Sequence, residues 1–346
     1  MNRRTFLSGT TAAATLAVAA PAGLAAPGAK QLKVLIPSMP PEQIADLKAA
    51  APSALLVVCQ TQAEALAQAA DADASFGFIT RELIRAGKKL RWVQQQSAGV
   101  EHVVNIPELV ESEIILTNMQ RAYAPEIADQ AIGYLLGFTR SLVHFVRTQS
   151  QEDWARRPQV MLEELEGKTM LIIGLGGIGS EIARRAWGFG MKMLATDPKV
   201  LQKPEYVEEL HKPAAFHSLL PRADVVASAV PLTPQSRKMI GEREFSMMKP
   251  GVILINVSRG GVVDTEALLR ALESKQVAAA GLDVTDPEPL PKGHALWKQQ
   301  NVIITPHSAG QSPGGSKRLF EVFRENLRRF AADEMLLNIV DKRAGY

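Results

Sequence analysis

Three polar side chains with complementary chemistry follow apolar, β-branched runs in the C-terminal half of the chain. Arg259 follows VILINVS, Glu288 lies in GLDVTDPEPLP, and His307 follows NVIITP. Residues just past the carboxyl ends of parallel strands line the ligand crevice of an open α/β sheet. A guanidinium can bind a carboxylate through two hydrogen bonds, and a His beside a Glu can transfer a proton near neutral pH. We therefore predict that Arg259, Glu288 and His307 are catalytic, in the kind of set that reduction of a 2-keto acid needs.

Each of these residues alone is more often a solvated or structural group than a catalytic one. Three of them in order, each after a predicted strand, favour the catalytic interpretation over that alternative.

A glycine-rich segment upstream predicts a dinucleotide site. In LIIGLGGIG, Gly174, Gly176 and Gly179 fit G-x-G-x-x-G between an apolar run and a helix-forming segment. The pattern permits a tight turn, close approach of a pyrophosphate and close helix packing, with phosphate charge at a helix N-terminus. Asp197, at the end of the next apolar run, can accept hydrogen bonds from ribose hydroxyls and would repel a 2′-phosphate. NAD is therefore predicted, although Lys199 weakens this preference and leaves NADP open.

Apolar runs alternate with helix-forming segments along most of the chain, which predicts parallel sheets. The first unit has candidate strands in KVLIP, ALLVVCQ, SFGFI, LRWVQQQ and IILTN, with helices over residues 41–50 and 61–70. A long helix is expected from Glu126 to about Thr148. The second unit has candidate strands in MLIIG, KMLAT, DVVASAV, VILINV, AAAGLDV and VIITP. A last helix, residues 316–332, is expected to fold back onto the first unit.

This order predicts an α/β protein with two Rossmann-like parallel-sheet domains and a cleft between them. A chain of 346 residues is long enough for two domains. Residues 30–124 and 308–346 are expected to form a flavodoxin-like substrate-binding domain. Residues 125–307 are expected to form the nucleotide domain inserted into it.

Composition argues against several classes of partner. The formal net charge is +3 and no long basic run occurs, so we expect no nucleic-acid partner. The single cysteine, Cys59, cannot form an internal disulfide and is expected to be a small buried hydrophobe. After the first 29 residues no segment approaches the apolar length of a membrane span.

The first 29 residues predict an export signal. MNRRTFLSG, an Ala-rich apolar stretch and the Ala20-Pro21-Ala22 site resemble a twin-arginine (Tat) signal. This predicts a periplasmic protein, or a cytoplasmic one if the signal is not used. The alternative is a basic tail that carries Arg3 and Arg4 by coincidence. The twin-arginine route carries folded proteins, which suits an enzyme that is loaded with its cofactor before export.

The motifs together resemble the D-isomer-specific 2-hydroxyacid dehydrogenases from about Lys33 to Leu337. The resemblance is densest in GKTMLIIGLGGIG, FGMKMLATDP, ADVVASAVPLTPQSRKMIG, MMKPGVILINVSRGGVVDTEAL, GLDVTDPEPLP and ITPHSAG. It implies NAD(P)-dependent reduction of a small 2-keto acid to a D-2-hydroxy acid, and the reverse reaction. It also implies a homodimer formed through the nucleotide domain, and no metal.

The resemblance assigns roles to particular residues. Arg259, Glu288 and His307 occupy the catalytic positions. The main-chain amides of Ala98, Gly99 and Val100, in SAGVEHV, would bind the substrate carboxylate together with Arg259 and His307. The implied cofactor-binding residues are Gly174, Gly176, Gly177, Ile178, Gly179, Asp197, Pro231, Thr233, Val257, Ser258, Asp283, His307 and Ala309.

The chain departs from the family pattern at two places. DVTDPEP, with Thr285 and Asp286, replaces the more usual DVFEEEP, and Asp129 and Gln130 stand where Ala-Glu-His is common. These departures bear on substrate preference more than on chemistry.

Two alternative functions stay open at this point. One is a dehydrogenase-fold dinucleotide-binding sensor without turnover, which would not need the proton-relay residues. The other is oxidation of phosphite or formate. The formate type usually has Gln where Glu288 stands, which disfavours it.

Overall fold

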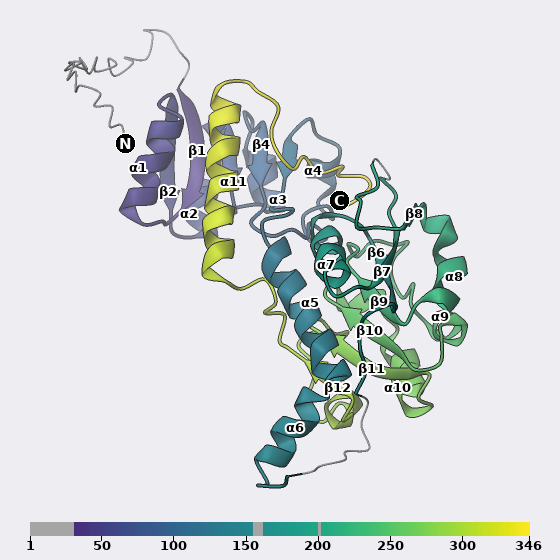
Figure 1. Cartoon of the computed structure of the whole chain (residues 1–346). Coiled ribbons are helices and arrows are strands. Elements are labelled where there is room, and N and C mark those ends of the chain that lie inside the picture. The colour runs from purple at the N-terminus through teal and green to yellow at the C-terminus, as the bar shows by residue number, and fades with distance from the viewer. Residues whose placement is uncertain (1–30, 155–161, 200–201) are drawn as a thin grey trace, which may run out of the picture.

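The computed structural model describes residues 31–154, 162–199 and 202–346, so the predicted export signal (residues 1–29) lies outside the described residues. Within these ranges the chain forms two α/β domains, each built on a parallel sheet (Figure 1). We call the domain that contains the N-terminal sheet the first domain and the other the second domain. The predicted α/β fold class with two parallel-sheet domains is confirmed.

The strands of the first sheet are β1 (Leu32–Pro37), β2 (Ala54–Cys59), β3 (Ala74–Phe76), β4 (Trp92–Gln94) and β5 (Ile115–Thr117). Those of the second sheet are β6 (Thr169–Ile173), β7 (Lys192–Thr196), β8 (Glu209–His211), β9 (Val225–Ser228), β10 (Val252–Asn256), β11 (Val277–Leu282) and β12 (Val302–Ile304). In the described residues the strand orders are β2-β1-β3-β4-β5 and β12-β11-β10-β9-β6-β7-β8.

The α-helices are α1 (Pro41–Ala50), α2 (Gln62–Ala67), α3 (Arg81–Ala86), α4 (Pro107–Val110), α5 (Ala124–Thr139), α6 (Leu142–Gln149), α7 (Gly177–Trp187), α8 (Phe216–Leu219), α9 (Glu242–Met247), α10 (Thr265–Glu273) and α11 (Pro313–Ala331). Short 3-10 helices are η1 (Ala69–Asp71), η2 (Pro213–Ala215), η3 (Leu220–Arg222), η4 (Gly260–Val262) and η5 (Ala295–Lys298).

The second sheet is buried on both faces, because successive side chains of its strands point to opposite sides. In β6, Leu171 and Ile173 belong to one apolar core, whereas Met170 and Ile172 belong to the core on the other face. This explains why the strands read as continuous apolar runs rather than as alternating ones.

The last helix returns to the first domain, as expected. The hydroxyl of Ser312 accepts a hydrogen bond from the Gly315 amide at 2.8 Å, and Pro313 occupies the first turn, so α11 begins there. Phe323 of α11 stacks on Phe76 of β3, with ring centroids 3.8 Å apart. Figure 1 shows α11, in yellow, beside β1 and β4. The second domain is therefore inserted into the first.

Two expectations about local structure were wrong. The single helix predicted from Glu126 to Thr148 is two helices, because the backbone of Ser141 is left-handed (φ 50°) and ends the hydrogen-bond ladder of α5. The edge strand β8 was not predicted, since ELH lacks an apolar run, and in the described residues it pairs with β7 alone. Cys59 is buried, as expected.

In the part of the chain that the structure describes, none of the helices has the length and apolar character needed to cross a bilayer.

Substitution at Gly281 tests the packing of α5 on the second sheet. A Cβ at this residue of β11 would lie 2.6 Å from Cγ of the buried Tyr134 ring. We expect Gly281→Ala to lower the free energy of unfolding by about 1–3 kcal/mol, measured by urea denaturation, because the core there has no spare volume.

Gly133→Ala is the matched control. Gly133 precedes Tyr134 in α5, is exposed, and a Cβ there would meet no atom of the described residues within 4 Å. This change should raise the free energy of unfolding by about 0.5–1 kcal/mol, as for an exposed helical glycine. A neutral Gly281→Ala variant would contradict the close packing.

Candidate active site

The three predicted catalytic residues follow neighbouring strands. Arg259 follows β10, Glu288 lies in the loop after β11, and His307 follows β12. These strands are adjacent and parallel, so their carboxyl ends reach the same edge of the second sheet. The fold therefore brings the three residues to one edge, as an α/β ligand site requires.

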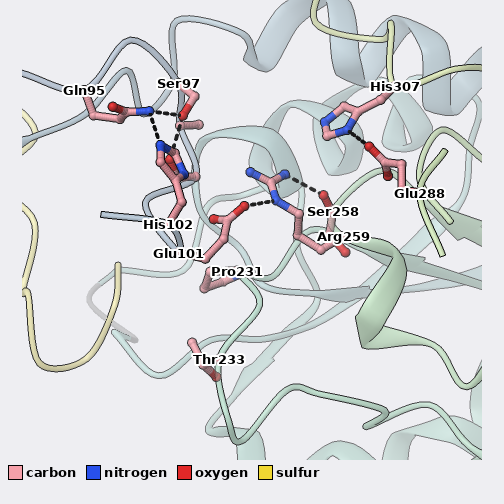
Figure 2. A network of polar contacts seen from close by, with 12 residues as sticks. Gln95, Ser97, Glu101, His102, Pro231, Thr233, Ser258, Arg259, Glu288 and His307 are labelled. Carbon is pink, nitrogen blue, oxygen red and sulfur yellow. Dashed lines mark hydrogen bonds and ion pairs between the residues drawn. The ribbon is translucent and has the colours of Figure 1, made fainter. Parts of the chain in front are cut away.

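His307 and Glu288 form a pair at this edge (Figure 2). His307 Nδ1 lies 2.6 Å from Glu288 Oε1, and both side chains are about half exposed. A carboxylate accepts, so Nδ1 carries the shared proton and the other ring nitrogen, Nε2, faces away from Glu288. Among the described residues Nε2 has no hydrogen-bond partner. The pair thus orients an imidazole whose Nε2 can exchange a proton with a bound molecule.

Arg259 contacts a residue of the first domain. Its Nε donates to Glu101 Oε1 at 2.6 Å, and its Nη1 donates to the Ser258 carbonyl oxygen at 2.7 Å. Burial alone would raise the pKa of the Glu101 carboxyl, but the hydrogen bond and charge of Arg259 outweigh burial and lower that pKa. The contact is therefore an ion pair that crosses between the domains.

The loop after β4 lies against Arg259. A Cβ at Gly99 would lie 1.8 Å from Arg259 Nη2, so the guanidinium occupies the space that a side chain would fill. The Ser97 hydroxyl donates to the Gly99 carbonyl oxygen at 2.6 Å, and Gln95 Nε2 lies 2.9 Å from that hydroxyl. Gln95 also contacts His102 at 3.0 Å (Figure 2). These contacts fix the loop in the conformation that faces Arg259.

The loop presents main-chain donors. Within the described residues, the amides of Ala98, Gly99 and Val100 donate to no protein acceptor, whereas the Ala98 carbonyl accepts from Asn118 Nδ2 at 2.7 Å. Amides left open beside a guanidinium are suited to an anion such as a carboxylate.

Asp283 holds the segment that carries His307. It is 4% exposed, and its Oδ1 accepts from the Thr305 hydroxyl at 2.5 Å and from the Ser308 amide at 3.0 Å. Its Oδ2 accepts from the Ala309 amide at 3.1 Å. The Thr305 hydroxyl also forms a hydrogen bond with the Tyr134 hydroxyl. The Asp283 carboxylate therefore organises the backbone of the segment that carries His307.

The glycine loop has the geometry of a phosphate cradle. Gly174 has φ 89°, and a Cβ at Gly179 would lie 1.9 Å from the Gly174 carbonyl oxygen. A Cβ at Gly176 would meet nothing within 4 Å among the described residues, so this turn is open to a ligand. Gly177 and Ile178 begin α7, an 11-residue helix. The residues present fit a dinucleotide whose pyrophosphate lies at that helix N-terminus.

Asp197, the acid predicted to bind the ribose, follows β7. Its carboxylate accepts from the amides of Leu175, at 2.9 Å, and Lys199, at 2.7 Å. It lines a pocket of about 550 Å³ together with Arg121 and Gly177. Asp197 is therefore beside the glycine loop, and both oxygens are held by main-chain donors.

The other predicted cofactor-binding residues lie in loops at the same edge. Pro231 and Thr233 come from the loop after β9, and Val257 and Ser258 follow β10 (Figure 2). The Ser258 hydroxyl is buried and lies 2.9 Å from that of Ser228. Ala309 is held by Asp283 through its amide.

Sequence reasoning missed three residues at this edge. Glu101 and His102 directly follow the predicted amides, and Arg121 packs its side chain against Gly177. The first two were visible as polar residues in SAGVEHV. The partner of Glu101, Arg259, is distant in the sequence, whereas His102 contacts the nearby Gln95. Arg121 carried no signal, since its position depends on a left-handed backbone (φ 73°) between the domains.

The described residues contain no group of three or more His, Cys, Asp or Glu side chains placed to hold a metal ion.

Comparison with known proteins identifies the family. The family model described as "D-isomer specific 2-hydroxyacid dehydrogenase, NAD binding domain" matches residues 132–309. The chain belongs to the D-isomer specific 2-hydroxyacid dehydrogenase family. It is therefore an oxidoreductase of the D-2-hydroxyacid dehydrogenase class with an NAD-binding domain.

Relatives of this dehydrogenase are similar over most of its length. It is 37% identical over 273 residues to the glyoxylate reductase of Thermococcus litoralis, a match that covers 76% of this chain and 81% of the relative. It is 31% identical over 285 residues to the D-3-phosphoglycerate dehydrogenase of Methanocaldococcus jannaschii, covering 81% and 54% of the two chains. The crystal structure of a D-isomer specific 2-hydroxyacid dehydrogenase from Xanthobacter autotrophicus Py2, in complex with NADPH and MES, is 26% identical, with a TM-score of 0.76 and coverage of 92% and 100%.

Asp283→Asn tests how the dehydrogenase holds its His307 loop. The Asn side-chain amide would place a hydrogen-bond donor against the main-chain N–H groups that now donate to the Asp283 carboxylate. We expect a loss of about 1–3 kcal/mol in the free energy of unfolding and faster amide exchange at Ser308 and Ala309. Asp286→Asn, in the exposed part of the neighbouring loop, is the control and should change neither. Equal behaviour of the two variants would show that Asp283 does not organise the loop.

Proposed function

We propose that the protein reduces a small 2-keto acid, with glyoxylate the first candidate, to the corresponding 2-hydroxy acid, of D configuration wherever C2 is a stereocentre, and catalyses the reverse reaction. The observation that carries this proposal is the arrangement of the three predicted catalytic residues and the loop of the first domain. The His307–Glu288 pair and Arg259 lie at one edge of the second sheet, and Arg259 contacts the loop of the first domain that presents open amides. The name of the Thermococcus litoralis relative supports glyoxylate.

Each residue has a distinct role in this reaction. The amides of Ala98, Gly99 and Val100 bind the substrate carboxylate together with Arg259. The Nη groups of Arg259 also polarise the keto oxygen. Reduced nicotinamide dinucleotide, when bound, supplies the hydride for the keto carbon. His307 donates the proton from Nε2 to the oxygen, and Glu288 orients its ring by accepting from Nδ1.

NAD is the proposed physiological cofactor. The Asp197 carboxylate lies beside the glycine loop and would repel a 2′-phosphate. Lys199 is a nearby cation, and the Xanthobacter autotrophicus Py2 structure contains NADPH, so use of NADP stays open. A sensor without turnover would have no need of the His307–Glu288 pair, and we therefore favour the enzyme.

We further propose that a second copy of the chain covers α6. This helix extends away from the body of the molecule (Figure 1), and Leu142, Val146 and the nearby Trp154 are 51%, 64% and 86% exposed. Large apolar side chains exposed together are typical of an interface. A homodimer through the second domain would bury them.

Export with bound cofactor is a separate proposal. Residues 1–29 resemble a twin-arginine signal, a route for folded proteins. The periplasm is not expected to supply free nicotinamide dinucleotide. We propose that the cofactor is carried out bound and recycled in place by paired oxidation and reduction of two substrates.

His307→Gln tests the proton-transfer role. We expect kcat for glyoxylate with NADH to fall by about 10²–10⁴-fold, because the amide cannot donate a proton in the same way. Fluorescence titration should show that the variant still binds NADH. His217→Gln is the matched control, since His217 also pairs with a Glu, Glu244, at 2.9 Å and is 41% exposed.

Near-normal turnover by His307→Gln would contradict the assignment. A wild-type enzyme that oxidises NADH with none of glyoxylate, hydroxypyruvate, pyruvate and phenylpyruvate would contradict the proposed function itself.

Purification of the mature periplasmic form without added cofactor tests export of the loaded enzyme. Denaturation should release close to one nicotinamide dinucleotide per chain, identified by mass spectrometry. Protein found in the periplasm without any bound dinucleotide would refute the proposal that the cofactor is carried out and recycled there.

A further inference from the structure

The carboxylate of Glu101 lies against the proposed substrate site. A Cβ at Gly99 would lie 2.6 Å from Glu101 Oε2 and 1.8 Å from Arg259 Nη2. Both charged groups therefore cover the same side of Gly99, whose amide is one of the proposed donors to the substrate carboxylate. A carboxylate bound at Arg259 and the Gly99 amide would therefore lie close to Glu101.

Glu101 occupies part of the hydrogen-bonding capacity of Arg259. Its Oε1 takes the Nε–H, and the Ser258 carbonyl takes one N–H of Nη1. The remaining donors lie on Nη1 and Nη2, and Nη2 faces Gly99. Arg259 is thus held in one orientation with its free donors directed toward the loop that binds the substrate.

The charge of Glu101 is present at neutral pH. Arg259 keeps the pKa of the Glu101 carboxyl below its ordinary value, and the Glu101 and Arg259 side chains are 34% and 25% exposed. Solvent therefore screens this carboxylate in part, but does not remove its field over a few ångströms. The Glu101 carboxylate would repel a second negative group on the substrate. Arg259, the cation paired with Glu101, is also needed to bind the first carboxylate of the substrate.

We propose that Glu101 is a specificity-determining residue that restricts the site to 2-keto acids with a single negative charge. The inference rests on the proposed function, because it assumes that a 2-keto acid binds at Arg259. Small uncharged substituents are accepted, as in glyoxylate, whereas substrates with a second carboxylate or a phosphate are disfavoured. The same side chain is a positioning residue for Arg259.

Oxamate and oxalate provide a direct test, since they have nearly the same shape and differ by one negative charge. Their affinities for the NADH-loaded protein are measured by isothermal titration for the wild type, Glu101→Gln and Glu101→Asp. We expect the wild type to prefer oxamate. Glu101→Gln should shift the ratio of the two affinities toward oxalate by roughly ten-fold, because it removes the charge and keeps the shape. Glu101→Asp, which keeps the charge, should stay within about two-fold of the wild-type ratio.

Glu111→Gln is the control for a general change in net charge, because Glu111 is exposed on the same domain and should leave the ratio unchanged. Glyoxylate reduction by the wild type is measured alongside. If the wild type reduces glyoxylate but Glu101→Gln leaves the ratio unchanged, or Glu101→Asp shifts it as Gln does, the role of the Glu101 charge is refuted and the proposed function stands. If the wild type reduces no 2-keto acid and binds neither oxamate nor oxalate, the proposed function fails and the inference fails with it.

Discussion

The ion pair between Arg259 and Glu101 is the contact on which the geometry of the candidate active site depends. It joins residues 158 positions apart in the sequence and connects the loops that follow β10 and β4, one from each domain. Gly99 makes the contact possible, because any side chain there would occupy the position of the guanidinium. A second contact between the domains places the Lys199 ammonium 4.7 Å from the centre of the Tyr346 ring. Of these two contacts, the Arg259–Glu101 pair is the one that contains a predicted catalytic residue.

The segment that carries His307 depends on the buried carboxylate of Asp283. His307 has a left-handed backbone (φ 51°), and its amide donates to the Asp283 carbonyl at 2.8 Å while the Asp283 side chain holds the next amides. A buried carboxylate that accepts several main-chain bonds is stable only when all of them form together. Such a network fixes the imidazole on a rigid support, which is what proton transfer over a hydrogen-bond distance requires.

The sequence was a good guide wherever one residue type at one position decides the local structure. Apolar runs placed the strands, and the positions of Arg259, Glu288 and His307 after them followed from the parallel topology. Features that depend on contacts between distant segments were not predictable. The partner of Arg259 lies in the other domain, and Asp283 was predicted only as a cofactor-binding residue, without its hydrogen bonds to the segment that carries His307. The helix break at Ser141 was also missed, since a serine is compatible with a helix and its left-handed backbone leaves no sequence signal.

Transfer of deuterium tests the central claim most directly. The purified protein is incubated with glyoxylate and NADH that carries deuterium at both positions of nicotinamide C4, and the glycolate is analysed by mass spectrometry and NMR. A cleft that holds the 2-keto acid beside the dinucleotide predicts one deuterium on the hydroxyl-bearing carbon of glycolate. Glycolate without deuterium, or no glycolate at all, would contradict the account.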